Sequence, residues 1–326
     1  MNTRTTRTTR RIMIAGGTGL IGRHLCEQLL ARGDEVVILS RHPEHTPQIN
    51  RGAAVLPWQP GDGPWARELD GIDAVVNLAG APFFTRWKGN YYHEQVIASR
   101  QAATDSLLNA MKAKPKRPAV FINGSSIGVY GYRRDDKPVT EATPPGDDFW
   151  GRDSIALEQR AAAAKQAGVR VVQLRTGIVL ARESGALGDQ LEQFRKGWGA
   201  IVLPGSQWFP WIHVDDVAAL IAFAIDNPDL DGALNATAPH PIQYRGYAQT
   251  LARSVGSSAR LRLPGWIMRR AIGPVATTVT HGRRVIPDKA TDAGFQFRYP
   301  TLETALGALL ADDSAAGRKP AGRPPT

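Results

Sequence analysis

Three closely spaced glycines near the start of the chain constrain the fold more than any other feature. An apolar run at residues 12–15 leads into Gly16, Gly19 and Gly22, and an amphipathic stretch over residues 20–30 follows at once. This order predicts a strand, a tight turn and a helix, in which backbone N–H groups face an anion and no Cβ blocks its approach. We therefore expect a dinucleotide pyrophosphate here, the alternative being a purely structural turn. The expected contacts are Gly16, Thr18, Gly19, Leu20, Ile21 and Gly22.

Composition places the chain among globular proteins with a substantial core. Of its 326 residues, 42% are hydrophobic. No apolar run reaches about 18 residues, so we expect no membrane span. The only cysteine, Cys26, falls in the first predicted helix and is expected to be a small core residue. A chain without a second cysteine forms no internal disulfide, which fits a reducing cytoplasm.

Six of the positive charges that give the chain its net charge of +10 lie at its two ends. Residues 1–10 carry three of them and residues 314–326 carry three more, which leaves +4 for residues 11–313. An RNA-binding function would rest on these end charges alone. We therefore expect a solvated surface rather than a nucleic-acid site.

Strand and helix patterns alternate through the first half of the chain. Apolar and β-branched runs predict strands, and helical spacing of apolar residues predicts the helices between them. The predicted strands span residues 12–15, 35–39, 53–56, 74–78, 119–123 and 169–174, and the predicted helices span residues 20–31, 91–112 and 149–166. This alternation predicts an α/β fold, a Rossmann-type doubly wound parallel sheet whose ligands bind at the carboxyl ends of the strands.

A change in composition near residue 182 indicates a second, smaller region. Glycine and tryptophan become frequent, and helical spacing returns at residues 217–225 and 247–255. We expect a nucleotide-binding Rossmann domain over residues 11–181. A smaller C-terminal α/β cap over residues 182–312 is expected to return in part to the main sheet. The ends, residues 1–10 and 313–326, are expected to be disordered tails.

The residues after the second predicted strand distinguish NAD from NADP. An acidic side chain there accepts hydrogen bonds from the ribose 2′-hydroxyl, whereas an arginine pairs with a 2′-phosphate. Here the strand ends in Ser40 and Arg41, and no acid is present. We therefore predict NADP(H), the alternative being that Arg41 is a solvated loop residue. Further cofactor contacts are expected at the ends of the third and fourth strands, from Trp58 (unless it belongs to the core), Gln59, Leu78, Ala79 and Gly80.

Several motifs give the chain a family resemblance. The glycine turn, residues 77–80 (Asn-Leu-Ala-Gly) and residues 124–131 (Gly-Ser-Ser-Ile-Gly-Val-Tyr-Gly) resemble the extended short-chain dehydrogenase/reductase superfamily. More narrowly, the chain is similar to atypical members of the NAD-dependent epimerase/dehydratase-like family, of the nucleoside-diphosphate-sugar epimerase type with a C-terminal extension. The narrower resemblance rests on residues 86–87, 99–100, 104, 174–180, 210–216 and 293–300.

This resemblance implies a Rossmann-type sheet that binds NADP, but it names no substrate. Arg86 and Arg100 are expected to bind an anionic group of the cofactor or substrate, or else to form surface ion pairs. Arg175 is expected to be structural and to tie a strand end to a neighbouring loop. The segment after that strand is expected under the nicotinamide. The cofactor contacts added here are Ser125, Thr176, Gly177 and Ile178.

The catalytic pair of this superfamily is missing from the chain. Its chemistry uses a tyrosine and a lysine four residues later on one helix, where the lysine lowers the tyrosine pKa. By position, Trp150 stands in place of the tyrosine and Ser154 in place of the lysine. No lysine anywhere in the sequence follows a tyrosine at this spacing. The standard mechanism therefore does not carry over.

Three residues are the candidates to replace that pair. Ser126 stands four residues before Tyr130, the spacing of the superfamily serine, with Ser125 as its alternative. Tyr130 offers a phenol at the same strand end, or else packs its ring beside the nicotinamide. His213 belongs to the one residue type that ordinarily titrates near neutral pH, but a histidine that precedes a helix is as often structural.

These observations predict an NADP(H)-dependent oxidoreductase or epimerase that transfers a hydride on a small carbonyl, carbinol or sugar-nucleotide substrate. The alternative is a catalytically reduced NADP(H)-binding sensor or regulator, for example one linked to cell division. No Cys/His cluster has zinc spacing, so no metal is expected. We expect a small-molecule partner, no nucleic acid, no membrane, a cytoplasmic location and, as a possible assembly, a homodimer.

Overall fold

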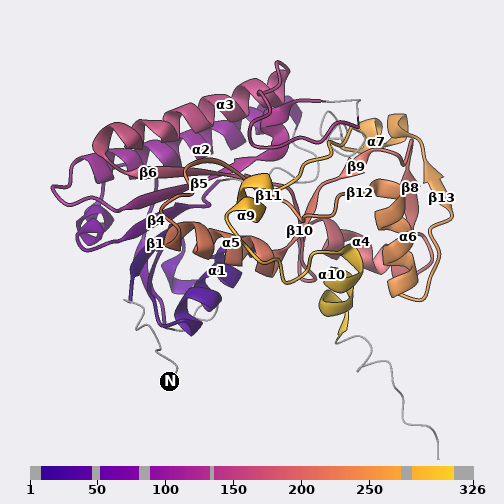
Figure 1. Cartoon of the computed structure of the whole chain (residues 1–326), viewed down its shortest axis with the longest axis horizontal. Coiled ribbons are helices and arrows are strands. Elements are labelled where there is room, and N and C mark those ends of the chain that lie inside the picture. The colour runs from indigo at the N-terminus through magenta and orange to yellow at the C-terminus, as the bar shows by residue number, and fades with distance from the viewer. Residues whose placement is uncertain (1–8, 46–51, 81–88, 133–135, 273–280, 312–326) are drawn as a thin grey trace, which may run out of the picture.

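A seven-stranded parallel sheet forms the centre of the molecule (Figure 1). The computed structural model describes residues 9–45, 52–80, 89–132, 136–272 and 281–311. The strands of this sheet are β1 (Arg11–Ala15), β2 (Glu35–Ser40), β3 (Ala54–Pro57), β4 (Ala74–Asn77), β5 (Val120–Ser126), β6 (Arg170–Thr176) and β11 (Gly232–Ala236). Their order is β11-β6-β5-β4-β1-β2-β3, so the direction of winding reverses between β1 and β4. This order confirms the predicted Rossmann-type doubly wound sheet.

Helices cover both faces of this sheet. Figure 1 shows α2 (Gly89–Lys112) and α3 (Phe149–Ala162) on one side, and α1 (Leu20–Ala31) and α5 (Val214–Asp226) on the other. A parallel sheet enclosed in this way buries both faces of its strands, which explains the unbroken apolar run in β1. Among the described residues, no helix is long and apolar enough to cross a membrane.

Local signals set the ends of several elements. The Asp148 carboxylate accepts a hydrogen bond of 2.9 Å from the Gly151 amide and thereby caps the start of α3. The predicted helix over residues 149–166 ends earlier than expected, because the chain tightens into a 3₁₀ helix after Ala162. The 3₁₀ helices of the described chain are η1 (Pro43–His45), η2 (Pro64–Leu69), η3 (Ile127–Tyr130) and η4 (Ala163–Ala167).

A second group of elements lies beyond the main sheet, on the right in Figure 1, and has a hydrophobic cluster of its own. It contains three two-stranded pairs, namely β7 (Ile178–Leu180) with β10 (Trp211–His213), β8 (Ala200–Val202) with β13 (Leu261–Leu263), and β9 (Trp208–Phe209) with β12 (Ile242–Gln243). Its helices are α4 (Gly185–Arg195), α6 (Tyr244–Ser254), α7 (Gly265–Ile272) and α10 (Leu302–Leu309), whereas α9 (Asp288–Asp292) packs beside β11 of the main sheet. Because β11 joins the main sheet, the chain crosses between the two regions more than once.

Long-range polar contacts hold the ends of the described chain to α5. The Asp216 carboxylate accepts hydrogen bonds of 2.9 Å from the amides of Arg298 and Tyr299. The Arg10 guanidinium donates to the carbonyl of Ile225 at 2.9 Å, although the sequence assigns Arg10 to a tail. These contacts fasten both ends of the described chain to one buried helix.

A histidine on α1 joins that helix to α5 and to the segment before α4. His24 Nδ1 lies 2.7 Å from Asp215 Oδ1, and His24 Nε2 lies 3.0 Å from Glu183 Oε1. The hydrogen bond to Asp215, opposed by burial and reinforced by Glu183, raises the pKa of His24 from 6.5 to about 9. The imidazolium therefore donates to two carboxylates at neutral pH.

We expect the charged His24 to stabilise the fold by about 1–2 kcal/mol, a value reduced by solvent screening of the partly exposed Glu183. Because folding raises its pKa, this contribution is complete below pH 6.5 and is lost as the pH rises through about 9. Urea unfolding of the parent and His24→Gln at about pH 6 and about pH 10 measures it. A difference in stability that stays constant with pH would contradict the assignment. The control His42→Gln removes an exposed histidine and should show no such trend.

Candidate functional site

The glycine turn lies at the point where the strand order reverses, between the carboxyl ends of β1 and β4. Gly16 has a φ of +86°, and a Cβ added to it would lie 2.7 Å from the carbonyl carbon of Leu78. A Cβ added to Gly22 would lie 2.3 Å from the Gly16 oxygen. Both positions therefore require glycine, and the absence of a Cβ there lets α1 pack closely against the sheet.

The start of α1 presents an uncapped helix N-terminus. Gly19 is the N-cap residue, no side chain caps the first turn, and the first turn contains no acidic residue. A Cβ added to Gly19 would meet only the Gly16 oxygen, at 3.3 Å, so the space in front of the turn is open. Thr18, Leu20 and Ile21 are partly buried around it. Unpaired amides and the helix dipole make this position suited to an anion.

The end of β2 provides a second polar group beside the turn. Ser40 is buried, and its hydroxyl accepts a hydrogen bond of 3.1 Å from the His42 amide. Arg41 is exposed, and the turn that follows β2 carries no acidic side chain before Glu44. Because β2 neighbours β1, Arg41 lies at the same edge of the sheet as the glycine turn. A ribose 2′-phosphate fits this position better than a ribose 2′-hydroxyl does, because the hydroxyl would need a carboxylate to accept its proton.

The two residues predicted after β3 do not share one environment. Trp58 is 5% exposed and makes an edge contact with Trp65 inside the cluster beneath the sheet. Its ring therefore belongs to the core, which is the alternative that the sequence left open, and the buried indole does not reach a cofactor at this strand end. Gln59, the next residue, is exposed.

The end of β4 is shaped by a buried polar network and an arginine. Asn77 donates to Thr104 and to Asn123, both at 3.1 Å, which fixes the start of the segment that contains Leu78 and Ala79. A Cβ added to Gly80 would lie 2.7 Å from the Cγ of Arg100, so the Arg100 side chain lies directly against this backbone. Burial lowers the pKa of Arg100. Arg86, the other predicted anion ligand, lies outside the described residues.

The ends of β5 and β6 lie side by side. Ser126 pairs in register with Thr176, and a Cβ added to Gly177 would lie 2.5 Å from the Pro210 oxygen. The Ser126 hydroxyl accepts a hydrogen bond of 3.0 Å from the Gly128 amide. Within the described chain, no acceptor takes the hydroxyl proton of Ser126. This proton is available to a bound molecule, as is the partly buried surface of Thr176, Gly177 and Ile178.

Ser125 points into a buried charged network instead. Its hydroxyl donates to Glu158 at 2.7 Å, and Glu158 forms two hydrogen bonds with Arg175, at 2.8 and 2.9 Å. Arg175 also donates to the Tyr130 hydroxyl at 2.9 Å, and that hydroxyl donates to Asn235 at 2.6 Å. Both carboxylate oxygens of Glu158 are therefore engaged. Arg175 is structural as predicted, but its partners are Glu158 on α3 and Tyr130 on η3 rather than a loop.

This network corrects the prediction of a catalytic Tyr130. The side chain is 1% exposed, its single proton is donated to Asn235, and burial raises its pKa. A buried phenol whose single proton is already donated is not placed to give it to a substrate. The Tyr130 ring packs instead beneath the Arg175 guanidinium, whose Cζ lies 4.9 Å from the ring centroid.

His213 is likewise held in a structural position. Its Nδ1 accepts a hydrogen bond of 3.0 Å from the Asp215 amide and so caps α5, and its ring stacks on Tyr299 at 3.9 Å. Burial lowers its pKa to about 4, so the ring is neutral at physiological pH. A buried helix cap does not fit the proton donor predicted from the sequence.

The positions of the missing catalytic pair lie at the start of α3, next to Ser126. A Cβ added to Gly128 would lie 3.2 Å from Ser126 Oγ and 3.6 Å from Ser154 Oγ, so two hydroxyls flank this glycine. Trp150 is partly buried and makes an edge contact with Phe149. Among the described residues, no group of three or more His, Cys, Asp or Glu could hold a metal.

Sequence reasoning missed Glu158 and Asn235. Glu158 is 5% exposed on a helix whose neighbouring Leu157 and Ala161 are buried. An acid on the apolar face of an Ala-rich helix is a readable signal for a buried partner. Asn235 carries no such signal, because its partner Tyr130 lies 105 residues away.

We expect Arg175→Met to destabilise the protein by about 3–5 kcal/mol, because it leaves the Glu158 carboxylate buried without its cation. The double variant Arg175→Met/Glu158→Leu should recover most of the loss, which urea unfolding measures. Arg160→Met is the matched control, because the ion pair of Arg160 on α3 with Asp105 on α2 is exposed and its loss should cost less than about 1 kcal/mol. Equal losses in the two single variants would contradict the buried-pair assignment.

The fold and the site together define a dinucleotide-binding Rossmann protein. Comparison with known sequences identifies its family. Residues 12–236 match the NAD dependent epimerase/dehydratase family, and residues 263–309 match a domain of unknown function, DUF1731. The chain therefore belongs to the NAD-dependent epimerase/dehydratase family, as the resemblance predicted.

Relatives from distant organisms match over nearly their whole length. The human epimerase family protein SDR39U1 is 33% identical over 306 residues, 92% of this chain and all of that protein. The epimerase family protein YfhF of Bacillus subtilis is 32% identical over 301 residues, 92% of this chain and 98% of that one. The crystal structure of human SDR39U1 (isoform 2) with NADPH superposes with a TM-score of 0.79 and 30% identity, over 93% of this chain and 99% of that one.

Proposed function

We propose that this protein binds NADP(H) and acts as an oxidoreductase or epimerase of the atypical short-chain dehydrogenase type. The observation that carries the proposal is the open, uncapped N-terminus of α1 beside an Arg41 that has no acidic neighbour before Glu44. The NADPH in the structure of the human relative supports the same cofactor.

The chain's own residues divide the work of binding. The amides at the start of α1 receive the pyrophosphate, and Ser40 and Arg41 receive the 2′-phosphate. The segment of Thr176, Gly177 and Ile178 supports the nicotinamide. When bound, NADPH supplies a hydride, which fits a small carbonyl, carbinol or sugar-nucleotide substrate.

Proton handling falls to Ser126 or to water. The Ser126 hydroxyl can donate to a substrate oxygen, since its own oxygen already accepts from Gly128 and its proton has no acceptor among the described residues. Tyr130 and His213 are engaged elsewhere. Ser126 is therefore the residue that orients the reacting oxygen, without a lysine to lower its pKa.

A second candidate, an NADP(H)-binding sensor or regulator, draws on the same geometry. Trp150 and Ser154 replace the acid–base pair, and the buried Tyr130 does not compensate for its loss. Such a protein would keep the cofactor site and transmit its occupancy to a partner.

The Arg41→Ala variant tests the cofactor. We expect it to bind NADPH about 10- to 100-fold more weakly, because a charge-assisted contact with the 2′-phosphate is lost, and to bind NADH as the parent does. Calorimetric titration of both nucleotides measures this. Arg117→Ala, which precedes β5 at the opposite edge of the sheet, is the control and should change neither affinity. Binding of neither nucleotide to the parent would overturn the proposal.

Turnover separates the enzyme from the sensor. We expect steady NADPH oxidation with at least one member of a panel of carbonyl and sugar-nucleotide substrates. Ser126→Ala should lower kcat about 100-fold while NADPH affinity is kept, and Ser126→Thr should restore much of the rate because it retains the hydroxyl. Tight NADPH binding without turnover across the panel would favour the sensor.

A further inference from the structure

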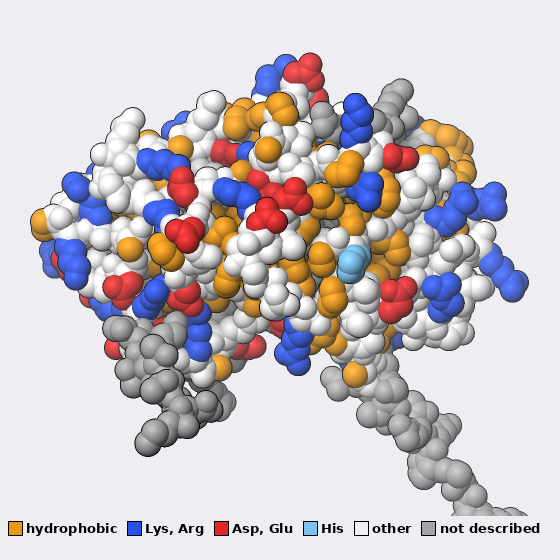
Figure 2. All heavy atoms as spheres, viewed as in Figure 1, with side chains coloured by type: hydrophobic (Ala, Val, Ile, Leu, Met, Phe, Trp, Pro, Cys, Tyr) orange, Lys and Arg blue, Asp and Glu red, His pale blue; other side chains and the backbone are white. Residues whose placement is uncertain are grey.

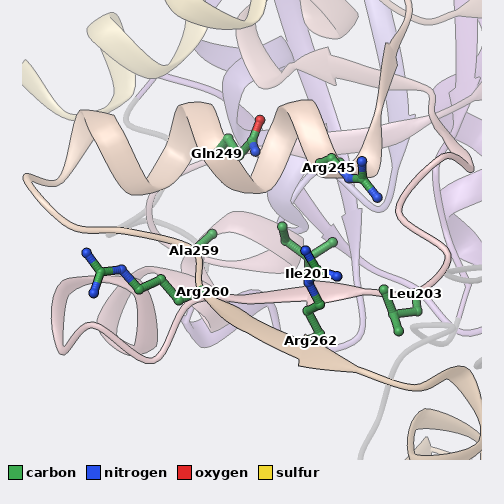
Figure 3. A pocket seen from close by; sticks show the side chains of 7 residues that line it. All are labelled: Ile201, Leu203, Arg245, Gln249, Ala259, Arg260 and Arg262. Carbon is green, nitrogen blue, oxygen red and sulfur yellow. The ribbon is translucent and has the colours of Figure 1, made fainter.

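A groove far along the chain from the glycine turn is lined by arginines. It has a volume of about 340 Å³ and lies between α6 and the β8–β13 pair (Figure 3). This volume falls in the range of small-molecule sites, about 300–1,000 Å³. The groove is lined by Ile201, Leu203, Arg245, Gln249, Ala259, Arg260 and Arg262.

Two of the arginines reach over the same space. Figure 3 shows Arg262 rising from β13 towards α6, and Arg245 extending from the first turn of α6, while Arg260 points outward along the groove. A Cβ added to Gly205 would lie 3.3 Å from Arg245 Nε, so the Arg245 side chain lies back over the turn after β8. The groove is therefore a cradle with two guanidinium groups on its walls and an aliphatic floor.

These cations have no opposite charge beside them. In the part of the chain that the structure describes, no carboxylate lies within ion-pair distance of Arg245, Arg260 or Arg262. Among the described residues, these side chains make one polar contact, a long one of 3.5 Å from Arg245 Nη2 to the Pro204 oxygen. Like charges that share a groove repel one another unless an anion joins them.

The surrounding sequence is depleted of acids over a long stretch. Residues 232–287 contain eight arginines and no aspartate, glutamate or lysine, so this segment carries +8. Residues 193–214, which include β8, also lack acids. Figure 2 shows Lys and Arg side chains gathered along the edge where β13 lies. Three of these eight arginines, Arg245, Arg260 and Arg262, line the groove.

We propose that this groove is a second ligand site, which binds a small multivalent oxyanion such as a diphosphate group. Two guanidinium forks match the geometry of phosphate or carboxylate oxygens, and the Gln249 amide adds a neutral donor. A multivalent anion fits best because two cations, Arg245 and Arg262, face the groove and a third, Arg260, lies at its end. Neither the glycine turn nor the strand ends of the cofactor site line this groove, so the proposal is independent of the NADP(H) function.

Calorimetry on the full chain at low ionic strength tests the site, with inorganic pyrophosphate and citrate as probes. We expect Arg245→Gln/Arg262→Gln to weaken binding by about 10-fold or more, because two charge-assisted contacts are lost. The matched control, Arg253→Gln/Arg270→Gln, removes two exposed charges outside the groove and should leave affinity close to that of the parent. The stronger probe identifies the oxyanion as phosphate or carboxylate.

Three outcomes would overturn the proposal. They are no binding of either probe to the parent, equal binding to the parent and the groove variant, and equal losses in the groove and control variants. NADPH titration of the groove variant should match the parent, which keeps a failure here distinct from a failure of the cofactor site. Thermal unfolding of each variant verifies that the protein is folded.

Discussion

The ion pair between Glu158 and Arg175 fixes α3 against the ends of β5 and β6, and much of the site depends on it. Taking two charges out of water is costly, and Ser125 and Tyr130 offset this cost by completing the hydrogen bonds of the pair, while Asn235 accepts the Tyr130 proton. The pair thereby determines which hydroxyl groups are used within the network and which one stays available to a ligand. Ser125 and Tyr130 are bound to it, and the neighbouring Ser126 is left facing the site.

In this arrangement, no described tyrosine or histidine near the site replaces the missing acid–base pair of the short-chain dehydrogenase scaffold. The Tyr130 phenol belongs to the buried hydrogen-bond network, and the His213 imidazole caps α5. Their burial moves both pKa values away from neutrality, upward for Tyr130 and downward for His213. Chemistry at this site would use a hydroxyl or water and the geometry of binding rather than a tuned side-chain acid.

The chain offers anions two physically different environments. At the glycine turn, backbone amides and a helix dipole provide the attraction, and close packing of Gly16 and Gly22 sets their positions. In the groove between α6 and β13, exposed guanidinium charges provide the attraction, so binding there is more sensitive to salt. The two environments are separated in the fold, and a ligand in one need not compete for the other.

The sequence by itself determined the strand–turn–helix at the glycine motif, the alternating sheet and the absence of the Tyr/Lys pair. These follow from local periodicity and spacing, which neighbouring residues carry. Only the tertiary structure decided that Trp58 is core, that Tyr130 bonds Asn235, that Glu158 meets Arg175 and that His24 joins Asp215. Each of these depends on which way a side chain points once segments distant in sequence pack together, because burial and pairing energies arise between segments and not within them.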